Sequence, residues 1–177
     1  MFRLRIQLRD VHPEIWRRVL VPGSVRMDKL AIMLIAAMGW NNSHLHAFRI
    51  GDKDYGMPAE DWPDGEIDEK TVTVLQVLRG EGDFTFDYDF GDGWEHDVAV
   101  EELVWSSPGL KHAVCLDGEN ACPPDDVGGA SGYVSFLEAI TDDAHEEHDD
   151  YVEWIGGPFD PAEFNLANAN ALCQKVH

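Results

Sequence analysis

A stretch of nine residues, 88–96, gathers side chains that could bind a metal ion. It reads YDFGDGWEH and follows a run of alternating aromatic residues. Its two glycines offer the positive φ that a tight hairpin needs. Asp89, Asp92 and His96 would then converge at the end of the hairpin, where carboxylate and imidazole ligands suit a divalent cation such as zinc. The alternative is a turn whose acids are solvated and whose aromatic side chains pack beneath it.

A second pair of candidate ligands lies in the tripeptide His-Leu-His at 44–46. In a strand, His44 and His46 project from one face about 7 Å apart. Two imidazoles at that spacing can bind one ion, and His96 from the hairpin could supply a third. Histidines also satisfy buried backbone carbonyls, so the structural interpretation stays open.

Three cysteines form a weaker candidate site. Cys115 and Cys122 are separated by six residues, whereas the spacing in zinc knuckles is about two to four. Cys173 would have to come from the end of the chain, or histidines would have to complete the set. An odd number of cysteines favours reduced thiols over a disulfide framework. The simpler interpretation is a pair of small buried thiols.

Charge is divided unevenly along the chain. Residues 1–79 contain 11 basic residues (Lys and Arg) and 11 acidic residues (Asp and Glu). Residues 80–177 contain 2 basic and 23 acidic residues, so the whole net charge of −21 lies in this second part. Such a surface repels a phosphate backbone, which disfavours nucleic acid and favours a protein as the partner. The main concentration of basic side chains is Arg3, Arg5, Arg9, Arg17 and Arg18. We expect these arginines to neutralise acids of the second part, or of a partner, rather than to bind phosphate.

The elements that would position these residues indicate an α+β fold with a mixed, mainly antiparallel sheet. Residues 2–9 alternate between apolar and polar side chains, and after a proline turn residues 14–22 supply a second strand, so the chain begins with a strand pair. Leucine, methionine and alanine follow helical spacing in residues 24–40, which predicts a core-facing helix that stops at a glycine. Residues 83–90 and 94–105 flank the glycine turn and predict a central hairpin.

Shorter segments complete the predicted architecture. Residues 44–51 predict a strand, residues 52–70 a polar loop, and residues 71–80 a short helix. Residues 107–132 are predicted to be irregular. Because sheet and helices alternate without a regular βαβ rhythm, α+β is favoured over a doubly wound sheet.

The C-terminal part, about residues 133–177, is predicted to be helical and strongly acidic. Its last helix is expected to begin with Asp160 as N-cap and Pro161 at the first helical position. The chain length fits one domain, 1–177. No apolar run approaches the roughly 20 residues that span a bilayer, and the alternating N-terminus differs from a signal peptide. We therefore expect a cytoplasmic protein without a membrane partner.

Several ordered segments resemble one protein family. They read IWRRVLVPGSVRMDKLAIMLIAAMGWNNSHLHAFRI, YGMP, FDYDFGDGWEHDV, CLDGENACPPDDVGGASGY and FDPAEFN. The chain resembles the plasmid pRiA4b ORF-3-like family of bacteria and archaea, whose members are often labelled TnpR resolvase or insertion-element passenger protein. The resemblance covers nearly the whole chain and implies a single α+β domain without an established activity. Relatives often read CPPEDCGG where this chain reads CPPDDVGG, so Val127 replaces a potential third thiolate near Cys115 and Cys122.

Three functions follow from these observations, in decreasing order of preference. The first is a non-catalytic protein-interaction or regulatory module associated with plasmids or mobile elements. The second is a metal-dependent, hydrolase-like enzyme that uses the histidines and aspartates. The third is a DNA-binding accessory of recombination that uses the N-terminal arginines. The resolvase label does not fit as a mechanism, because a helix-turn-helix tail needs cations and only Lys111 and Lys175 follow residue 80.

Overall fold

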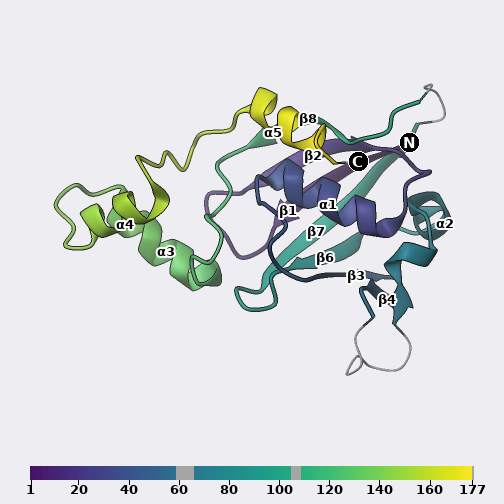
Figure 1. Ribbon diagram of the computed structural model, residues 1–177, viewed down its shortest axis with the longest axis horizontal. Helices are drawn as coiled ribbons and strands as arrows, with labels where there is room; N and C mark the ends of the chain where they lie inside the picture. Colours follow the sequence, from purple (N-terminus) through teal and green to yellow (C-terminus); the bar gives the residue numbers. More distant parts are fainter. Residues whose placement is uncertain (59–65, 105–108, 177) are drawn as a thin grey trace.

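The computed structural model describes residues 1–58, 66–104 and 109–176. The described strands are β1 (Phe2–Leu8), β2 (Trp16–Val21), β3 (His46–Ile50), β4 (Lys53–Gly56), β5 (Ile67–Asp68), β6 (Phe84–Tyr88), β7 (Trp94–Leu103) and β8 (Val114–Glu119). They form one sheet in the order β5-β4-β3-β6-β7-β1-β2-β8 (Figure 1). Neighbouring strands are antiparallel, except that β4 and β5 are parallel. The predicted α+β fold with a mixed, mainly antiparallel sheet is confirmed.

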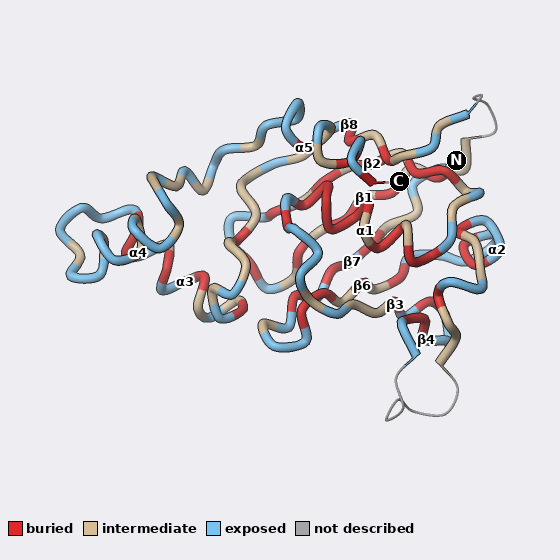
Figure 2. The backbone as a smooth tube through the Cα atoms, in the orientation of Figure 1, coloured by how far each residue is buried: buried red, intermediate tan, exposed pale blue. Residues whose placement is uncertain are grey.

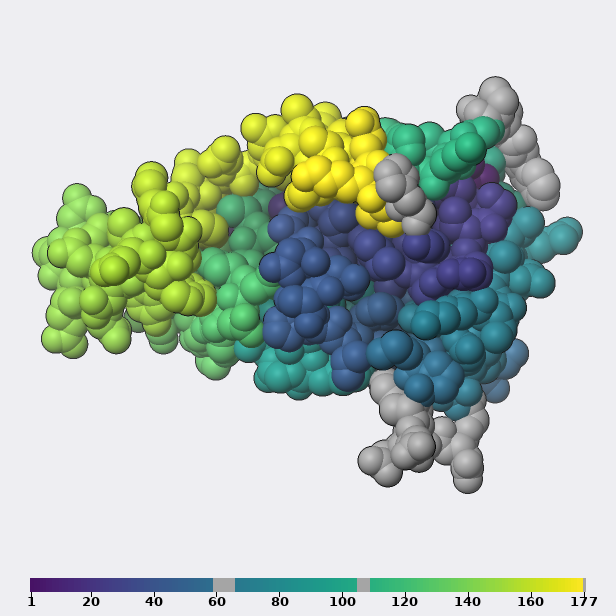
Figure 3. Space-filling model, viewed as in Figure 1, coloured from purple at the N-terminus to yellow at the C-terminus, as the bar shows by residue number. Residues whose placement is uncertain are grey.

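Helices lie on one face and at one end of this sheet. The described helices are α1 (Met27–Met38), α2 (Val74–Leu78), α3 (Gly129–Ile140), α4 (His148–Ile155) and α5 (Leu166–Cys173), with a 3-10 turn, η1 (Glu69–Thr71), before α2. α1 and α5 pack against each other and against the sheet, whereas α3 and α4 extend from one end of the molecule (Figures 1 and 3). None of the described helices has the length and apolar character needed to cross a bilayer.

Alternating side chains give the sheet one apolar face and one polar face. The buried row of β1 consists of Phe2, Leu4, Ile6 and Leu8. α1 covers this row, and it ends where Gly39, at φ 122°, donates its backbone N–H to the Ile35 carbonyl at 3.0 Å, as the sequence predicted. Each large apolar side chain buried in this way contributes about 1.5–3 kcal/mol. The layer between α1 and the central strands is therefore the main core (Figure 2).

The opposite face of the central strands carries arginines paired with acids. Arg9 contacts Glu95 at 2.6 Å, and Arg18 contacts Glu101 at 2.8 Å. The other pairs on this face are Arg3 with Glu101 and Glu102, Arg5 with Glu14, Arg9 with Asp97, and Arg18 with Asp117. Partly exposed pairs contribute about 0–1 kcal/mol each. Arg3, Arg9 and Arg18 thus pair with acids of the second part of the chain, as expected. Arg5 instead pairs with Glu14 of the first part. For Arg17 the expectation is wrong, because this residue lies on the core face and its guanidinium donates to backbone carbonyls.

Three stretches differ from the sequence prediction. The polar loop predicted at 52–70 contains β4, β5 and the start of η1, and its residues 59–65 lie outside the described part of the chain. The irregular region predicted at 107–132 contains β8, which pairs with β2 although its polar residues interrupt the apolar alternation. The strand predicted to reach residue 105 ends at Leu103, and residue 105 itself is not among the described residues.

The last helix also begins later than predicted. The Asp160 carboxylate accepts a hydrogen bond from the Ala162 N–H at 2.9 Å, but the chain there makes only a turn. α5 begins after Asn165, whose side-chain oxygen accepts a hydrogen bond from the Asn168 N–H at 2.9 Å. The predicted N-cap, Asp160, is therefore wrong, and Asn165, also a good cap former, takes that role.

Candidate metal centre

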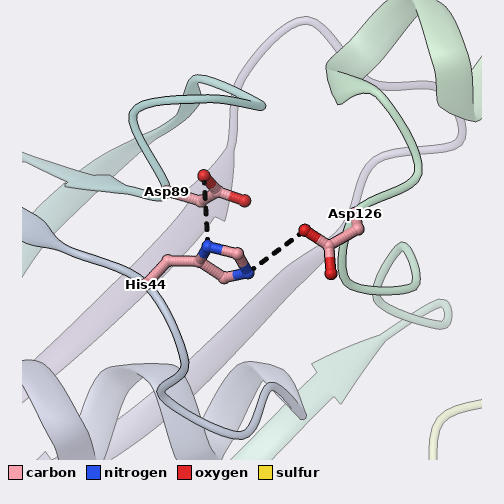
Figure 4. Close-up of side chains that lie close together, drawn as sticks. All are labelled: His44, Asp89 and Asp126. Atoms are coloured by element: carbon pink, nitrogen blue, oxygen red, sulfur yellow. Dashed lines mark ion pairs between the residues drawn. The ribbon is translucent and has the colours of Figure 1, made fainter.

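One imidazole and two carboxylates meet where three segments approach one another. His44 lies just before β3, Asp89 just after β6, and Asp126 in the loop before α3. The distance from His44 Nδ1 to Asp89 Oδ1 is 3.5 Å, and the distance from His44 Nε2 to Asp126 Oδ1 is 3.4 Å (Figure 4). Within the described residues, these three form the one group of His, Cys, Asp or Glu side chains close enough to share an ion.

The hairpin turn holds Asp89 in place. Asp89 adopts a positive φ of 55° and accepts hydrogen bonds from the backbone N–H groups of Gly91 at 3.0 Å and Asp92 at 3.4 Å. Gly93 takes the second positive φ, 68°, and its N–H donates to the Asp89 carbonyl at 2.6 Å. The sequence prediction had given the positive φ values to the two glycines, whereas Asp89 replaces Gly91 in that role. This buried carboxylate is therefore fixed by its own turn.

Aromatic packing supports the turn and the imidazole. Tyr88 and Trp94 lie beneath the turn, and the Trp40 ring contacts both, with centroid distances of 5.0 and 5.9 Å. The His44 ring stands edge-on to Tyr88 at 5.8 Å. The Ser43 N–H donates to the Tyr88 hydroxyl at 3.2 Å, which anchors the segment that carries His44. The packed aromatic side chains thus lie beneath the hairpin that carries Asp89 and contact the segment that carries His44.

Asp92 ties the hairpin to the loop that carries Asp126. The Asp92 carboxylate accepts a hydrogen bond from the Gly128 N–H at 3.1 Å. A Cβ atom at Gly129 would lie 2.4 Å from the Asp92 carbonyl oxygen, so the two segments approach as closely as only glycine allows. Asp126 itself has a positive φ of 60°. Asp92 therefore positions the cluster rather than entering it.

Electrostatics at the cluster are dominated by negative charge. Burial, together with the neighbouring carboxylates of Asp126 and Asp89, raises the pKa of the Asp125 carboxyl, while the His44 imidazole opposes the shift. Carboxylates that repel one another in this way are stabilised by a cation between them. The local charge favours a divalent ion.

The two contacts of His44 involve opposite ring nitrogens. The distances of 3.5 Å from Nδ1 to Asp89 and 3.4 Å from Nε2 to Asp126 exceed a good N–H···O distance. Two ligands that each lie about 2.1 Å from one zinc ion, at a tetrahedral angle, are about 3.4 Å apart. Because one imidazole binds an ion through a single nitrogen, only one of the two contacts can correspond to that separation, and the other carboxylate must turn toward the ion. The exposed Asp126 has the freedom to do so, and the three ligand atoms already lie within 4.8 Å of one another.

The other predicted histidine ligands have different partners. His46 Nε2 lies 3.0 Å from Glu69 Oε2, and Glu69 is buried. His96 is fully buried on the core face of β7, and its Nδ1 lies 2.9 Å from the Phe86 carbonyl oxygen. Burial lowers the pKa of His96 to about 4. Both residues therefore lie outside the cluster around His44.

The cysteines do not join the cluster either. The side chain of Asn170 in α5 holds the Cys115 backbone through two hydrogen bonds. It accepts one from the Cys115 N–H at 3.0 Å and donates one to the Cys115 carbonyl at 2.8 Å. Burial raises the pKa of Cys115 and Cys122, and raises that of Cys173 to about 12. These thiols stay protonated at neutral pH, as small buried side chains do.

Sequence reasoning did not single out Asp126 as a candidate ligand. The segment CPPDDVGG drew attention only for its cysteine spacing and for Val127. The useful signal was the acid pair Asp125 and Asp126, one residue before two glycines, a combination typical of a tight loop with polar side chains displayed at one point.

Known proteins match this chain over most of its length. The family model described as plasmid pRiA4b ORF-3-like protein matches residues 1–168. A protein of Sinorhizobium fredii (strain NBRC 101917 / NGR234), named uncharacterized protein y4hQ, is 43% identical over 171 residues, which are 95% of this chain and 88% of the relative. The crystal structure of the protein of unknown function MM3350 from Methanosarcina mazei Go1 superimposes with a TM-score of 0.83 at 30% identity, covering 94% of this chain and 96% of that one. The chain therefore belongs to the plasmid pRiA4b ORF-3-like protein family.

Proposed function

We propose that the protein is a metal-dependent domain with a hydrolase-like activity, in which His44, Asp89 and Asp126 bind a divalent cation. The observation that carries this proposal is the approach of one imidazole and two carboxylates, from three separate segments, to within 4.8 Å. A mixture of imidazole and carboxylate ligands suits zinc or manganese. This support moves the metal-dependent function ahead of the interaction module that the sequence favoured.

Three protein ligands leave coordination positions for water and for a substrate. A divalent ion lowers the pKa of its bound water and polarises a carbonyl or phosphoryl oxygen, so water can attack without a nucleophilic side chain. The Asp126 side chain is 72% exposed, which makes the centre reachable from solvent. Asp125, whose pKa is raised, is the nearby carboxyl suited to exchange a proton with water or a leaving group.

Metal titration tests the centre directly. Chelator-treated protein would be titrated with Zn²⁺ and with Mn²⁺ in a calorimeter, and we expect one site per chain. His44→Ala and Asp126→Asn should each weaken binding at least about tenfold. Asp149→Asn, which changes an exposed acid of α4, is the matched control and should retain the wild-type affinity. If wild type takes up neither ion, or if both site variants bind as wild type does, the centre is refuted.

Activity is tested separately from binding. Chromogenic phosphate and carboxylate esters would be incubated with the metal-free and the metal-loaded protein. Hydrolysis should require the ion and should be lost in Asp126→Asn. Metal binding without hydrolysis of any ester would support the metal centre and reject the catalytic part of the proposal.

A second candidate is the protein-interaction module, supported by the surface of α3 and α4. Residues 129–157 contain eight acids and no Lys or Arg. Within the same residues, Val134 and Trp154 expose 53% and 48% of their surface. An acidic surface with an exposed tryptophan is complementary to a basic segment of a partner protein. The association with plasmids or mobile elements belongs to this second candidate.

Loss of binding in a single variant tests this surface. Wild type and Trp154→Ala would be used to capture proteins from cell lysate at low and at high salt, and captured proteins would be identified by mass spectrometry. We expect a basic protein that is retained by wild type at low salt, released at high salt, and not captured by Trp154→Ala. Equal capture by wild type and Trp154→Ala would reject this surface as a protein-binding site. The DNA-binding alternative has less support, because the arginines it would use lie in ion pairs with acids of the same chain.

A further inference from the structure

A charged side chain interrupts the apolar row on the core face of β2. Arg17 occupies the inward row together with Val19 and Val21, and only 3% of its surface is exposed. The neighbouring Arg18 points to the polar face and pairs with Glu101. Buried guanidinium groups are normally paired with an acid. Arg17 has no carboxylate within ion-pair distance among the residues that the structure describes.

Backbone carbonyls satisfy only part of this guanidinium. Nη1 of Arg17 donates to the carbonyls of Trp16 and Glu119, each at 2.8 Å, and Nη2 donates to the carbonyl of Asn120 at 2.8 Å. A guanidinium has five N–H donors. The Nε–H has no acceptor in the described structure, and Nη2 has one further N–H. Nε and Nη2 lie on one edge of the group, which is the edge that binds a carboxylate through two parallel hydrogen bonds.

The fold makes room for this arginine. The Arg17 guanidinium lies over the Phe164 ring, 4.4 Å from its centroid. A Cβ atom at Gly118 would lie 2.7 Å from Arg17 Cδ and 2.8 Å from Phe164 Cζ, so only glycine leaves space for both side chains there. Burial lowers the pKa of Arg17, and the nearby thiols act in the opposite direction. The position is therefore built around a cation that lacks an anionic partner.

Arg17 also lines a cavity of about 300 Å³ between the end of α1 and α5. The remainder of the wall includes Cys122, Phe159, Phe164 and Asn168. This volume lies at the lower end of the range for small-molecule sites, which is about 300–1,000 Å³. The aromatic rings supply an apolar surface, and Asn168 supplies a polar group at the exposed side. The cavity can hold a molecule with a flat apolar body.

We propose that this cavity binds a small monocarboxylic acid with an apolar body, whose carboxylate pairs with the Arg17 guanidinium in the cavity wall. A monoanion is favoured over a phosphate because Asp160 and Glu163 also line the cavity and would repel a second negative charge. The site lies apart from the cluster around His44, whose three members do not line this cavity. It therefore represents a ligand-binding function separate from the metal centre.

Benzoate is the probe for this site, with benzamide as its uncharged analogue of the same shape and inorganic phosphate as the alternative anion. Metal-free ¹⁵N-labelled protein would be titrated with each compound, and the Arg17 Nε–Hε signal would be followed by NMR. We expect a saturable shift of this signal with benzoate, none with benzamide, and a weaker response to phosphate. A response to phosphate that is tighter than the response to benzoate would overturn the assignment to carboxylates, and no response to either anion would overturn the site.

A pair of variants on α5 separates binding from the structural role of Arg17. Asn168→Trp places a large side chain in the cavity wall, and the Asn168 side chain makes none of the hydrogen bonds identified around Arg17. Ala167→Trp adds the same side chain at an exposed position outside the wall. The benzoate shift should be lost in Asn168→Trp and kept in Ala167→Trp, with equal unfolding midpoints for both variants. Loss in both variants, or retention in both, contradicts binding in this cavity.

Discussion

Acidification should destabilise the protein through one buried histidine. His96 is fully buried in β7, and its Nδ1 lies 2.9 Å from the Phe86 carbonyl, while its Nε2 has no described partner. Trp40 and Phe86 pack against the ring, with centroid distances of 5.5 and 5.6 Å. Burial penalises the charged imidazolium and lowers the pKa of His96 from 6.5 to about 4. The folded protein therefore holds this histidine neutral, whereas the unfolded chain accepts a proton at a higher pH.

The direction and size of the effect follow from this difference in pKa. Between pH 6.5 and about 4 the unfolded state binds the extra proton, so the free energy of unfolding falls as the pH falls through this window. The loss is about 2 kcal/mol on going from about pH 7.5 to about pH 5, and it reaches about 3 kcal/mol below about pH 4. That loss is a large fraction of the 5–15 kcal/mol or so that stabilises a typical domain.

Denaturant unfolding at the two pH values measures the effect. His96→Leu removes the titrating group, so its free energy of unfolding should fall by about 2 kcal/mol less than that of wild type over the same interval. His12→Gln changes an exposed histidine and should behave as wild type does. The variant and wild type share the carboxylates, so their contributions cancel in the comparison. Equal pH dependence of wild type and His96→Leu would refute the assignment to His96.

Three further predictions concern close packing and buried thiols. Gly118→Ala should lower the free energy of unfolding by about 1–3 kcal/mol in denaturant titrations, because its Cβ would lie 2.7 Å from Arg17 Cδ; wild-type stability would contradict the packing. Gly129→Ala should loosen the contact with Asp92, since Gly129 has a φ of 68°. We expect weaker Zn²⁺ binding in calorimetry, with a comparatively small change in the unfolding midpoint. Burial raises the pKa of Cys173 to about 12, so this thiol should react with a thiol reagent at neutral pH only after unfolding. Mass spectrometry of labelled peptides would show this, and rapid labelling of the native protein would contradict the burial of Cys173.

The sequence predicted best those elements whose side chains repeat with a clear period. β1 and β6 alternate strictly, and α1 repeats its apolar residues at helical spacing and ends at a glycine, so all three lie where the pattern placed them. β8 was missed because Asp117 and Gly118 break the alternation in a short edge strand. Its position is fixed by pairing with β2, which is a tertiary contact and leaves no local signal.

The candidate sites show the same division between local pattern and tertiary contact. The hairpin acids were visible in the sequence, but the partner of His44 in the loop before α3 was not, because 36 residues separate Asp89 from Asp126. Arg17 was grouped with the other N-terminal arginines, although it falls in the same alternating row as Val19 and Val21. An arginine in an apolar row is a buried polar group that requires an explanation.

The central position of β1 in the sheet has a consequence for how quickly the protein folds. β1 pairs with β2 through a short connection, but its other neighbour is β7, and Phe2 lies opposite Leu103. Closing a loop of about 100 residues costs about 4 kcal/mol of chain entropy before that pairing is formed. Folding should therefore be limited by the search for this distant partner, on a timescale of milliseconds to seconds. Until β7 arrives, the hairpin of β1 and β2 presents an open edge to other nascent chains, and chaperones would protect the protein most during this interval.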